Sequence, residues 1–196
     1  MDAGGAGHRQ FVFGYGSLVG PPGRPPNGRG SAGGVIADLL GFRRVWGVAM
    51  DNRRDLPGYK YYTDARGRRP AVFVTFLDIR PAPEAGAAVT GLCVPADDAG
   101  LAALDRRERN YDRIDVSDRI RVDGTDGVRV WTYVGSAAGR ERLRRGMAAG
   151  RAVIDANYLD TVRAGLALLG DDQRRTCLGS LDPGDLPVVR LRRHEL

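Results

Sequence analysis

The feature that most constrains the fold is a stretch of alternating apolar and polar residues between positions 113 and 134. Apolar side chains recur with period two up to position 122, and again from Val128 to Val134, with a Gly- and Asp-rich turn at 123–127 between them. Period two places alternate side chains on opposite faces of a strand, and a short polar turn joins two strands into a hairpin. The sequence therefore predicts a pair of antiparallel, half-buried strands here.

The order of the remaining segments predicts the fold class. Short apolar strands are expected in four further regions of the chain, at 11–13, 35–50, 71–79 and 90–94. A short helix is expected after Asp97 and Asp98, which can cap it, and a long helix over 151–169. Strands that precede a short middle helix and late helices favour an α+β fold with an antiparallel or mixed sheet over a doubly wound one.

Length and composition favour a single domain spanning residues 1–196, with 1–10 and 185–196 as flexible or peripheral tails. The Gly- and Pro-rich segment 20–34 predicts a flexible loop, since neither residue suits a helix or a central strand. No run approaches the roughly 18 apolar residues of a membrane span, and the N-terminus lacks an apolar signal-peptide core. We therefore expect a cytoplasmic protein without a membrane partner.

The formal charge of +6 suits an anionic partner, and the arginine-rich run 140–145 leaves nucleic-acid binding open. Arginine is nevertheless scattered among acidic residues, so a solvated surface is the favoured interpretation of that run and nucleic acid is not the expected partner. His8 and His194 lie near opposite ends of the chain, which disfavours a metal site. Cys93 and Cys177 are expected to be free, buried thiols, and no cofactor is expected.

Two glycines follow the first predicted strand, in the sequence Gly14-Tyr15-Gly16-Ser17-Leu18. A dinucleotide-binding loop would carry a third glycine at position 19, where this chain has Val19, and would continue into a helix rather than a Pro-rich segment. A glycine turn still lets a ligand approach the backbone and its N–H groups. A plain structural turn explains the same residues equally well.

A carboxylate lies on the apolar face of the predicted middle helix. Leu101, Leu104 and Glu108 are spaced i, i+3 and i+7, which places them on one face. An acid on such a stripe can accept and donate a proton in catalysis. The alternative is that Glu108 only marks the end of the helix and pairs with a nearby arginine.

These segments resemble the γ-glutamylcyclotransferase-like superfamily. The turn is similar to its Y-G-S signature, and residues 89–113, with Leu104-Asp105 and Glu108, look like its second signature, a strand followed by a helix that ends L-D-x-x-E. Residues 129–134 resemble the strand that follows, and residues 41–44 resemble the ChaC-like branch. Segment 20–34 and the tyrosines of 59–62 have no counterpart, and we expect them to influence substrate choice.

The resemblance implies a closed, barrel-like mixed β-sheet flanked by helices. It also implies an enzyme that converts a γ-glutamyl peptide or amine into 5-oxoproline and a free amine, without metal or cofactor. The implied general acid and base is Glu108, and the implied substrate-binding residues are Tyr15, Gly16, Ser17, Leu18, Tyr111 and Tyr133. A non-catalytic module that binds a small anion or a partner is the alternative. Oligomeric state and the identity of the leaving amine stay open.

Overall fold

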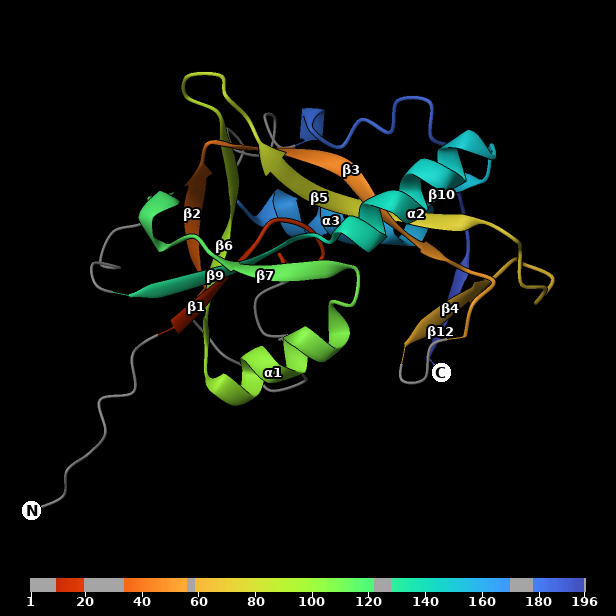
Figure 1. Ribbon diagram of the computed structural model, residues 1–196, viewed down its shortest axis with the longest axis horizontal. Helices are drawn as coiled ribbons and strands as arrows, with labels where there is room; N and C mark the ends of the chain where they lie inside the picture. Colours follow the sequence, from red (N-terminus) through yellow and green to blue (C-terminus); the bar gives the residue numbers. More distant parts are fainter. Residues whose placement is uncertain (1–9, 20–33, 56–58, 122–127, 170–177, 196) are drawn as a thin grey trace, which may run out of the picture.

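The computed structural model describes residues 10–19, 34–55, 59–121, 128–169 and 178–195. The strands in these ranges are β1 (Gln10–Gly14), β2 (Val35–Leu40), β3 (Phe42–Asp51), β4 (Lys60–Thr63), β5 (Phe73–Pro81), β6 (Ala88–Ala96), β7 (Tyr111–Asp115), β8 (Ile120–Arg121), β9 (Arg129–Gly135), β10 (Ala152–Asp155), β11 (Val188–Val189) and β12 (Arg192–Glu195). The helices are α1 (Asp98–Arg107), α2 (Ala137–Ala148) and α3 (Ala156–Leu166), with 3₁₀ turns η1 (Ser117–Arg119) and η2 (Ala167–Leu169). The fold is α+β, as predicted (Figure 1).

The largest sheet has six strands in the order β7-β9-β1-β6-β2-β8. Strand β1 lies at its centre, antiparallel to β6 and parallel to β9, so the sheet is mixed. Within the described residues no sheet closes on itself, so the expected closed barrel is not confirmed. Strands β7 and β8 follow one another in the chain through η1, but they lie at opposite edges of the sheet and do not pair with each other, because β8 pairs with β2.

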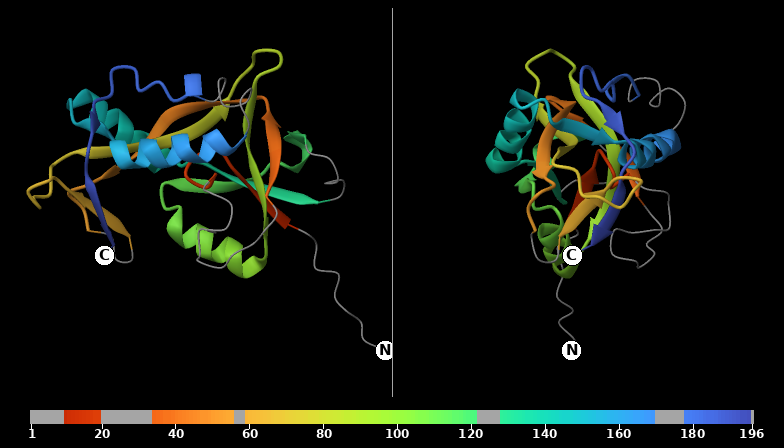
Figure 2. Two further views of the ribbon diagram at one scale, coloured as in Figure 1. Left: turned by 180° about the vertical axis from the view of Figure 1, so that it is seen from behind. Right: turned by 90° about the vertical axis from the view of Figure 1, so that its right-hand side faces the viewer.

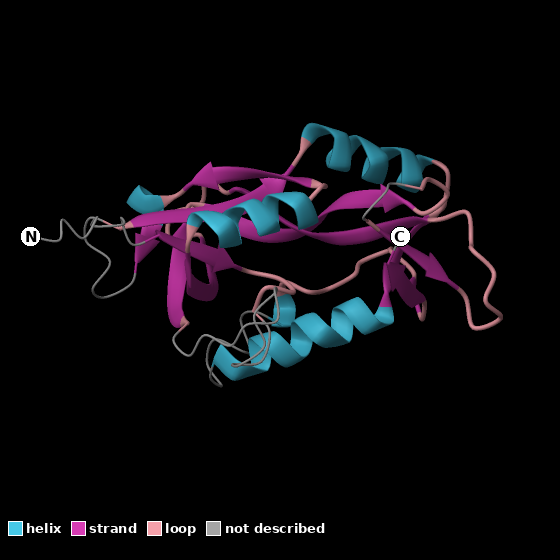
Figure 3. Ribbon diagram, turned by 90° about the horizontal axis from the view of Figure 1, so that it is seen from below, coloured by secondary structure: helices cyan, strands magenta, loops and turns pink. Residues whose placement is uncertain are grey.

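A second sheet has the order β11-β10-β5-β3, and a third pairs β12 with β4. Helices α2 and α3 lie on opposite sides of the strands, as the view along the long axis shows (Figures 2 and 3). The main core lies between the strands and α3, and includes Phe13, Leu77, Ile154 and Val162, none of them more than 1% exposed. Helix α1 and the β4–β12 pair both project from the same side of the molecule (Figures 1 and 2).

The predicted hairpin is present in part. Strand β7 pairs antiparallel with β9, with Tyr111 opposite Gly135 and Asp115 opposite Trp131. The expected single strand over 113–122 is wrong, because η1 interrupts it after Val116. The turn expected at 123–127 lies outside the described residues.

Helix α1 confirms the sequence prediction. Asp97 caps its N-terminus by accepting a hydrogen bond from the amide of Gly100, and Leu101 and Leu104 are buried. The prediction of one helix over 151–169 is wrong at its start, because Ala152–Asp155 form a fully buried strand between β5 and β11. A buried parallel strand is a continuous apolar run, which periodicity alone does not distinguish from a buried helix.

The arginine-rich run 140–145 forms the middle half of α2 and is not simply a solvated stretch. Arg140 donates to Asp78 at 3.1 Å, and Arg142 donates to the carbonyl of Ala49 and the side chain of Asn110. Leu143 is buried against β3 and β5 in the cluster that contains Ala49. Two arginines of this run therefore attach α2 to the rest of the molecule.

The C-terminal residues, expected as part of a tail, form β11 and β12. His194 of β12 stacks on Tyr61 and lies 2.9 Å from the hydroxyl of Thr63. Cys93 is buried and free, whereas Cys177 and His8 lie outside the described residues. Within the described part of the chain, no helix is long and apolar enough to cross a membrane.

Gly165 of α3 tests how closely that helix must approach the residues after β1. A Cβ at position 165 would lie 1.8 Å from the carbonyl oxygen of Val19, which is backbone and cannot rotate away. We expect Gly165→Ala to lower the free energy of unfolding by about 1–3 kcal/mol, a typical cost of overpacking. Chemical denaturation measures this. Gly179→Ala, where a Cβ meets nothing within 4 Å, is the control, and an equal effect of the two changes would contradict the packing argument.

Candidate functional site

The YGS turn, residues 14–18, follows β1 directly and is tightly folded. The amide of Val19 donates to the carbonyl of Gly16 at 3.0 Å, which closes the turn. A Cβ on Gly14 would lie 2.7 Å from the Cβ of Leu18, so this position needs glycine. Gly91 of β6 is required for a related reason, because its Cβ would lie 2.2 Å from the carbonyl oxygen of Gly14.

A buried arginine fixes the turn from the other side. The Nε of Arg44 in β3 donates to the carbonyl of Tyr15 at 2.9 Å, and its terminal nitrogens donate to the carbonyl of Thr90 and the hydroxyl of Ser180, each at 2.8 Å. The hydroxyl of Tyr15 donates to the carbonyl of Tyr133 at 2.7 Å. Both ends of Tyr15 are therefore held, which orients the turn.

Glu108 ends α1 and begins the link to β7. Its amide donates to the carbonyl of Leu104 at 2.8 Å, and its own carbonyl accepts from the amide of Tyr111 at 2.9 Å. The side chain is 16% exposed, and one carboxylate oxygen lies 3.1 Å from the Nε of Arg107. The helix-end position and the arginine pair of the alternative interpretation are thus both present, but the carboxylate is also largely buried.

The turn and α1 pack together through one hydrophobic cluster. Leu101 and Leu104 of α1 are buried in this cluster with Val12 and Tyr133, and Leu18 and Tyr111 pack against it. Three of the predicted site residues, Leu18, Tyr111 and Tyr133, therefore pack with the buried leucines of α1.

Three buried tyrosines are close enough to Glu108 to feel its charge. Burial raises the pKa of Tyr15, Tyr111 and Tyr158, and the negative charge of Glu108 is among the further causes for each. The Tyr111 hydroxyl donates to the carbonyl of Leu77 at 2.6 Å, and the Tyr158 hydroxyl accepts from the amide of the same residue at 3.4 Å. These phenols stay protonated at neutral pH and act as neutral hydrogen-bonding groups.

Tyr133 is positioned differently from the other predicted residues. Its hydroxyl donates to Asp105 on α1 at 2.8 Å. Burial, followed by this hydrogen bond, raises its pKa. Its backbone carbonyl accepts from Tyr15, so Tyr133 joins α1 to the turn.

Sequence reasoning missed Arg44 as an anchor, Tyr158 as a neighbour of the turn, and Lys60. Tyr158 lies on α3, and its hydroxyl is 3.4 Å from where a Cβ on Gly16 would lie. Lys60 is the only lysine of the chain. Its pKa is lowered to about 8, chiefly by burial and then by Arg193, while Glu108 opposes the shift. The isolation of one lysine among many arginines was the only sequence signal for it.

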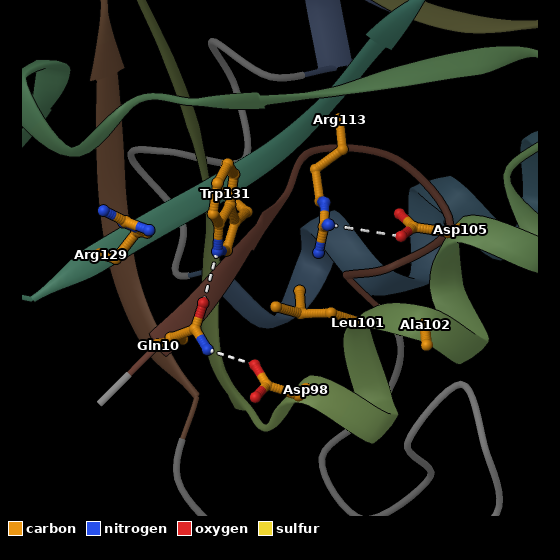
Figure 4. A pocket seen from close by; sticks show the side chains of 8 residues that line it. All are labelled: Gln10, Asp98, Leu101, Ala102, Asp105, Arg113, Arg129 and Trp131. Atoms are coloured by element: carbon orange, nitrogen blue, oxygen red, sulfur yellow. Dashed lines mark hydrogen bonds and ion pairs between the residues drawn. The ribbon is translucent and has the colours of Figure 1, made fainter. Parts of the chain in front are cut away.

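A separate cavity of about 360 Å³ lies beside the N-terminal half of α1 (Figure 4). It is lined by Gln10, Asp98, Leu101, Ala102, Asp105, Arg113, Arg129 and Trp131. Its polar groups already bind one another: Gln10 bridges Asp98 and the Trp131 indole at 2.8 Å each, and Arg113 pairs with Asp105 at 3.4 Å. Neither Glu108 nor the YGS turn lines this cavity, so we do not assign the chemistry to it.

Within the described ranges, no three His, Cys, Asp or Glu side chains are grouped as metal ligands would be. The ionisable groups around the turn are instead two carboxylates, Glu108 and the fully buried Asp78, with several phenols and a few cations. Such a set can transfer protons and bind charged substrate groups.

A family model described as "Gamma-glutamyl cyclotransferase, AIG2-like" matches residues 38–151, more than half of the chain. The protein therefore belongs to the AIG2-like γ-glutamylcyclotransferase family. No curated protein matches the sequence significantly.

Solved structures share the fold at low sequence identity. A human protein described as uncharacterized protein loc79017 has a TM-score of 0.54 and 16% identity, with 87% of each chain covered. A gamma-glutamyl cyclotransferase has a TM-score of 0.51 and 15% identity, covering 86% of this chain and 85% of that one. A yeast cyclotransferase described as specific to glutathione has a TM-score of 0.50 and 15% identity, covering 89% and 96%.

Replacing Arg44 tests whether its guanidinium holds the turn. Arg44→Met leaves the carbonyls of Tyr15 and Thr90 without their donor in a buried setting. We expect the free energy of unfolding to fall by about 1–3 kcal/mol, the cost of unsatisfied buried polar groups. Thermal or chemical denaturation measures the change. Arg43→Met, at the exposed neighbouring position, is the matched control, and a similar loss in both variants would contradict the anchoring role.

The lowered pKa of Lys60 predicts how the stability of the protein should change with pH. Its pKa is about 8 in the folded protein against an ordinary value of 10.5, so the unfolded chain binds the proton more tightly. Between these values the wild type should gain stability relative to Lys60→Met as pH rises, and below about pH 8 the variant should be the more stable. Denaturation of both proteins from pH 7 to 10.5 measures the difference. A constant difference would show that burial does not disfavour the charged amine.

Proposed function

We propose that the protein is an intramolecular cyclotransferase that converts a γ-glutamyl peptide or γ-glutamyl amine into 5-oxoproline and a free amine. Family membership supports the class of reaction. The observation that carries the proposal is the packing of the YGS turn and the end of α1 around one cluster, beside the carboxylate of Glu108. Glu108 acts as general acid and base, and the substrate site is formed with Tyr15, Gly16, Ser17, Leu18, Tyr111 and Tyr133.

One carboxylate, that of Glu108, can carry the protons that this reaction moves from the attacking nitrogen to the leaving nitrogen. The nitrogen of the substrate's α-amine attacks its own γ-carbonyl carbon, and the bond from that carbon to the leaving nitrogen breaks. An ammonium has no lone pair, so the Glu108 carboxylate first accepts a proton from it. The protonated Glu108 then gives this proton to the leaving nitrogen, which regenerates the carboxylate. The carboxylate next takes the second proton from the ring nitrogen and passes it to the released amine, so that 5-oxoproline keeps one N–H and the amine leaves as an ammonium. General acid–base assistance of this kind contributes about 10²–10⁴-fold.

Holding the substrate in a folded conformation supplies a further large part of the rate. Ring closure within one molecule, with the reacting atoms aligned, is worth about 7–11 kcal/mol of the barrier. The YGS turn supports this role, because within the described residues the amides of Ser17 and Leu18 have no hydrogen-bond partner. Successive free N–H groups can bind the α-carboxylate of the glutamyl group or the oxyanion formed at its γ-carbonyl.

The raised pKa values of the buried tyrosines bear on which group can exchange protons with the substrate. Burial raises the pKa of Tyr15 and Tyr111, so neither phenol loses its proton near neutral pH. Their O–H groups already donate to backbone carbonyls, and a neutral phenol does not act as the base. Asp78 also lies near Tyr15, but it is fully buried and accepts hydrogen bonds from two backbone amides and Arg140. Glu108, which keeps 16% of its side chain exposed, is therefore the base that we assign to the substrate ammonium.

Replacing Glu108 by glutamine tests the proposal. Glu108→Gln keeps the size of the side chain and removes its ability to accept a proton, so 5-oxoproline release should fall about 10²–10⁴-fold. The assay uses glutathione, γ-Glu-Ala and a γ-glutamyl amine, with detection of 5-oxoproline. Glu141→Gln, on the exposed side of α2, is the matched control and should retain wild-type activity.

Two results would contradict this proposal. Undiminished 5-oxoproline release by Glu108→Gln, with unfolding behaviour equal to the wild type, would remove Glu108 from the mechanism. Thermal stabilisation of the wild type by γ-glutamyl compounds without any turnover would instead favour a non-catalytic binding module.

A further inference from the structure

We propose that Lys60 of β4 forms a cationic subsite that binds a carboxylate on the leaving amine, so that γ-glutamyl amino acids and peptides are preferred over γ-glutamyl amines without that charge. The inference rests on the proposed function and names the class of substrate. It assigns specificity to the unpredicted strand β4 and to β12, which lies beyond the residues of the family match.

The Lys60 ammonium has an aromatic setting and no anionic partner. Its Nζ lies 4.4 Å from the centroid of the Phe76 ring and 5.3 Å from that of the Tyr59 ring. Within the described residues no carboxylate is in ion-pair contact with it, although many arginines pair with carboxylates, among them Arg53 with Asp51 and Arg140 with Asp78. A desolvated cation over aromatic faces is stabilised only in part by the rings. An anion supplied by a ligand would complete its environment.

The aromatic groups that hold Lys60 connect it to the candidate site. Phe76 contacts Tyr158 edge to face at 5.1 Å, and the Tyr158 hydroxyl reaches the Gly16 position. On the other side, the Tyr59 hydroxyl accepts a hydrogen bond at 3.3 Å from Asn110, which lies two residues after Glu108. Lys60 is thus connected to the turn through Phe76 and Tyr158, and to the end of α1 through Tyr59 and Asn110.

The charged groups that act on Lys60 or lie beside its aromatic contacts are three arginines and two glutamates, namely Arg107, Arg109, Arg193, Glu108 and Glu195. Arg109 lies 5.8 Å from the centroid of the same Tyr59 ring. In the β4–β12 pair, Glu195 lies opposite Lys60 and Arg193 opposite Tyr62. Glu195 is already bound by Arg193 at 2.6 Å, so it does not neutralise Lys60 by direct pairing. The region can therefore attract an anion.

The anion is best assigned to the leaving side of the substrate. A γ-glutamyl compound has one carboxylate on the glutamyl group, and the free amides of the YGS turn can bind it. Lys60 comes from a different strand and requires a second anion. The only other part of the substrate is the amine that leaves, so a carboxylate there completes the pairing.

The experiment compares two substrates that differ by this carboxylate, γ-Glu-Ala and γ-glutamyl-ethylamine. The wild type should have the higher kcat/KM with γ-Glu-Ala. In Lys60→Met the ratio of the two values should fall about 10- to 100-fold, as expected for loss of a hydrogen bond to a charged group. Lys60→Arg should restore most of the ratio, and Arg66→Met, an exposed charge change near β4, should not alter it.

A pH profile adds a readout that a purely structural role would not change. The charged and titratable groups facing Lys60 are Arg193, Glu195, Glu108, Arg107 and Tyr59, and burial is the main cause that lowers its pKa to about 8. The substrate ratio should therefore fall as pH rises through about 8 in the wild type, and stay level in Lys60→Arg. Deprotonation of the substrate amine affects both substrates alike and cancels in the ratio.

Binding to the Glu108→Gln variant separates this inference from the proposed function. Calorimetry should show tighter binding of γ-Glu-Ala than of γ-glutamyl-ethylamine, and Lys60→Met in the same background should remove the difference. This result would support the subsite even if no substrate is turned over, an outcome that would contradict only the proposed function. Equal binding of the two compounds, or a substrate ratio unchanged by Lys60→Met, would overturn the subsite.

Discussion

The buried guanidinium of Arg44 is the interaction on which the site depends. It joins the carbonyl of Tyr15, the carbonyl of Thr90 and the hydroxyl of Ser180, which are remote from one another in sequence. Planar nitrogen donors in a fixed arrangement suit this role, because each bond orients the others. Close packing at Gly91 and Gly165 completes the support of the turn. The YGS turn is therefore held by polar bonds and by steric fit together.

Patterns among residues close in sequence predicted those parts of the site that depend on interactions between near neighbours in the chain. The N-cap at Asp97 and the apolar spacing of Leu101 and Leu104 defined α1, and both are confirmed. Glu108 follows from the same spacing, and its place at the helix end is confirmed while its catalytic role remains a prediction. The turn was also recognisable in the sequence by its two glycines. The structure explains the first of them, because Gly14 has no room for a side chain.

Long-range pairing explains what the sequence did not reveal. The strand Ala152–Asp155 looked helical because a buried strand and a buried helix share an apolar pattern, and only the neighbours β5 and β11 distinguish them. The closed barrel was expected from resemblance, but the edge strands β7 and β8 do not pair with each other in the described residues. Lys60 approaches the site through β4, Phe76 and Tyr158, contacts that no local pattern encodes.

Charge distribution unites the proposed chemistry and the proposed specificity. Removing a proton from a substrate ammonium needs a carboxylate beside it, whereas holding an anionic leaving group needs a cation that does not neutralise that carboxylate. Glu108 ends α1 and Lys60 lies on β4, with the neutral phenol of Tyr59 and its bond to Asn110 between them. Burial raises the pKa of Tyr59 to about 12, so this group adds no charge near neutral pH. A site arranged in this way can act on both ends of the scissile bond, because its base and its cation belong to separate elements of the fold.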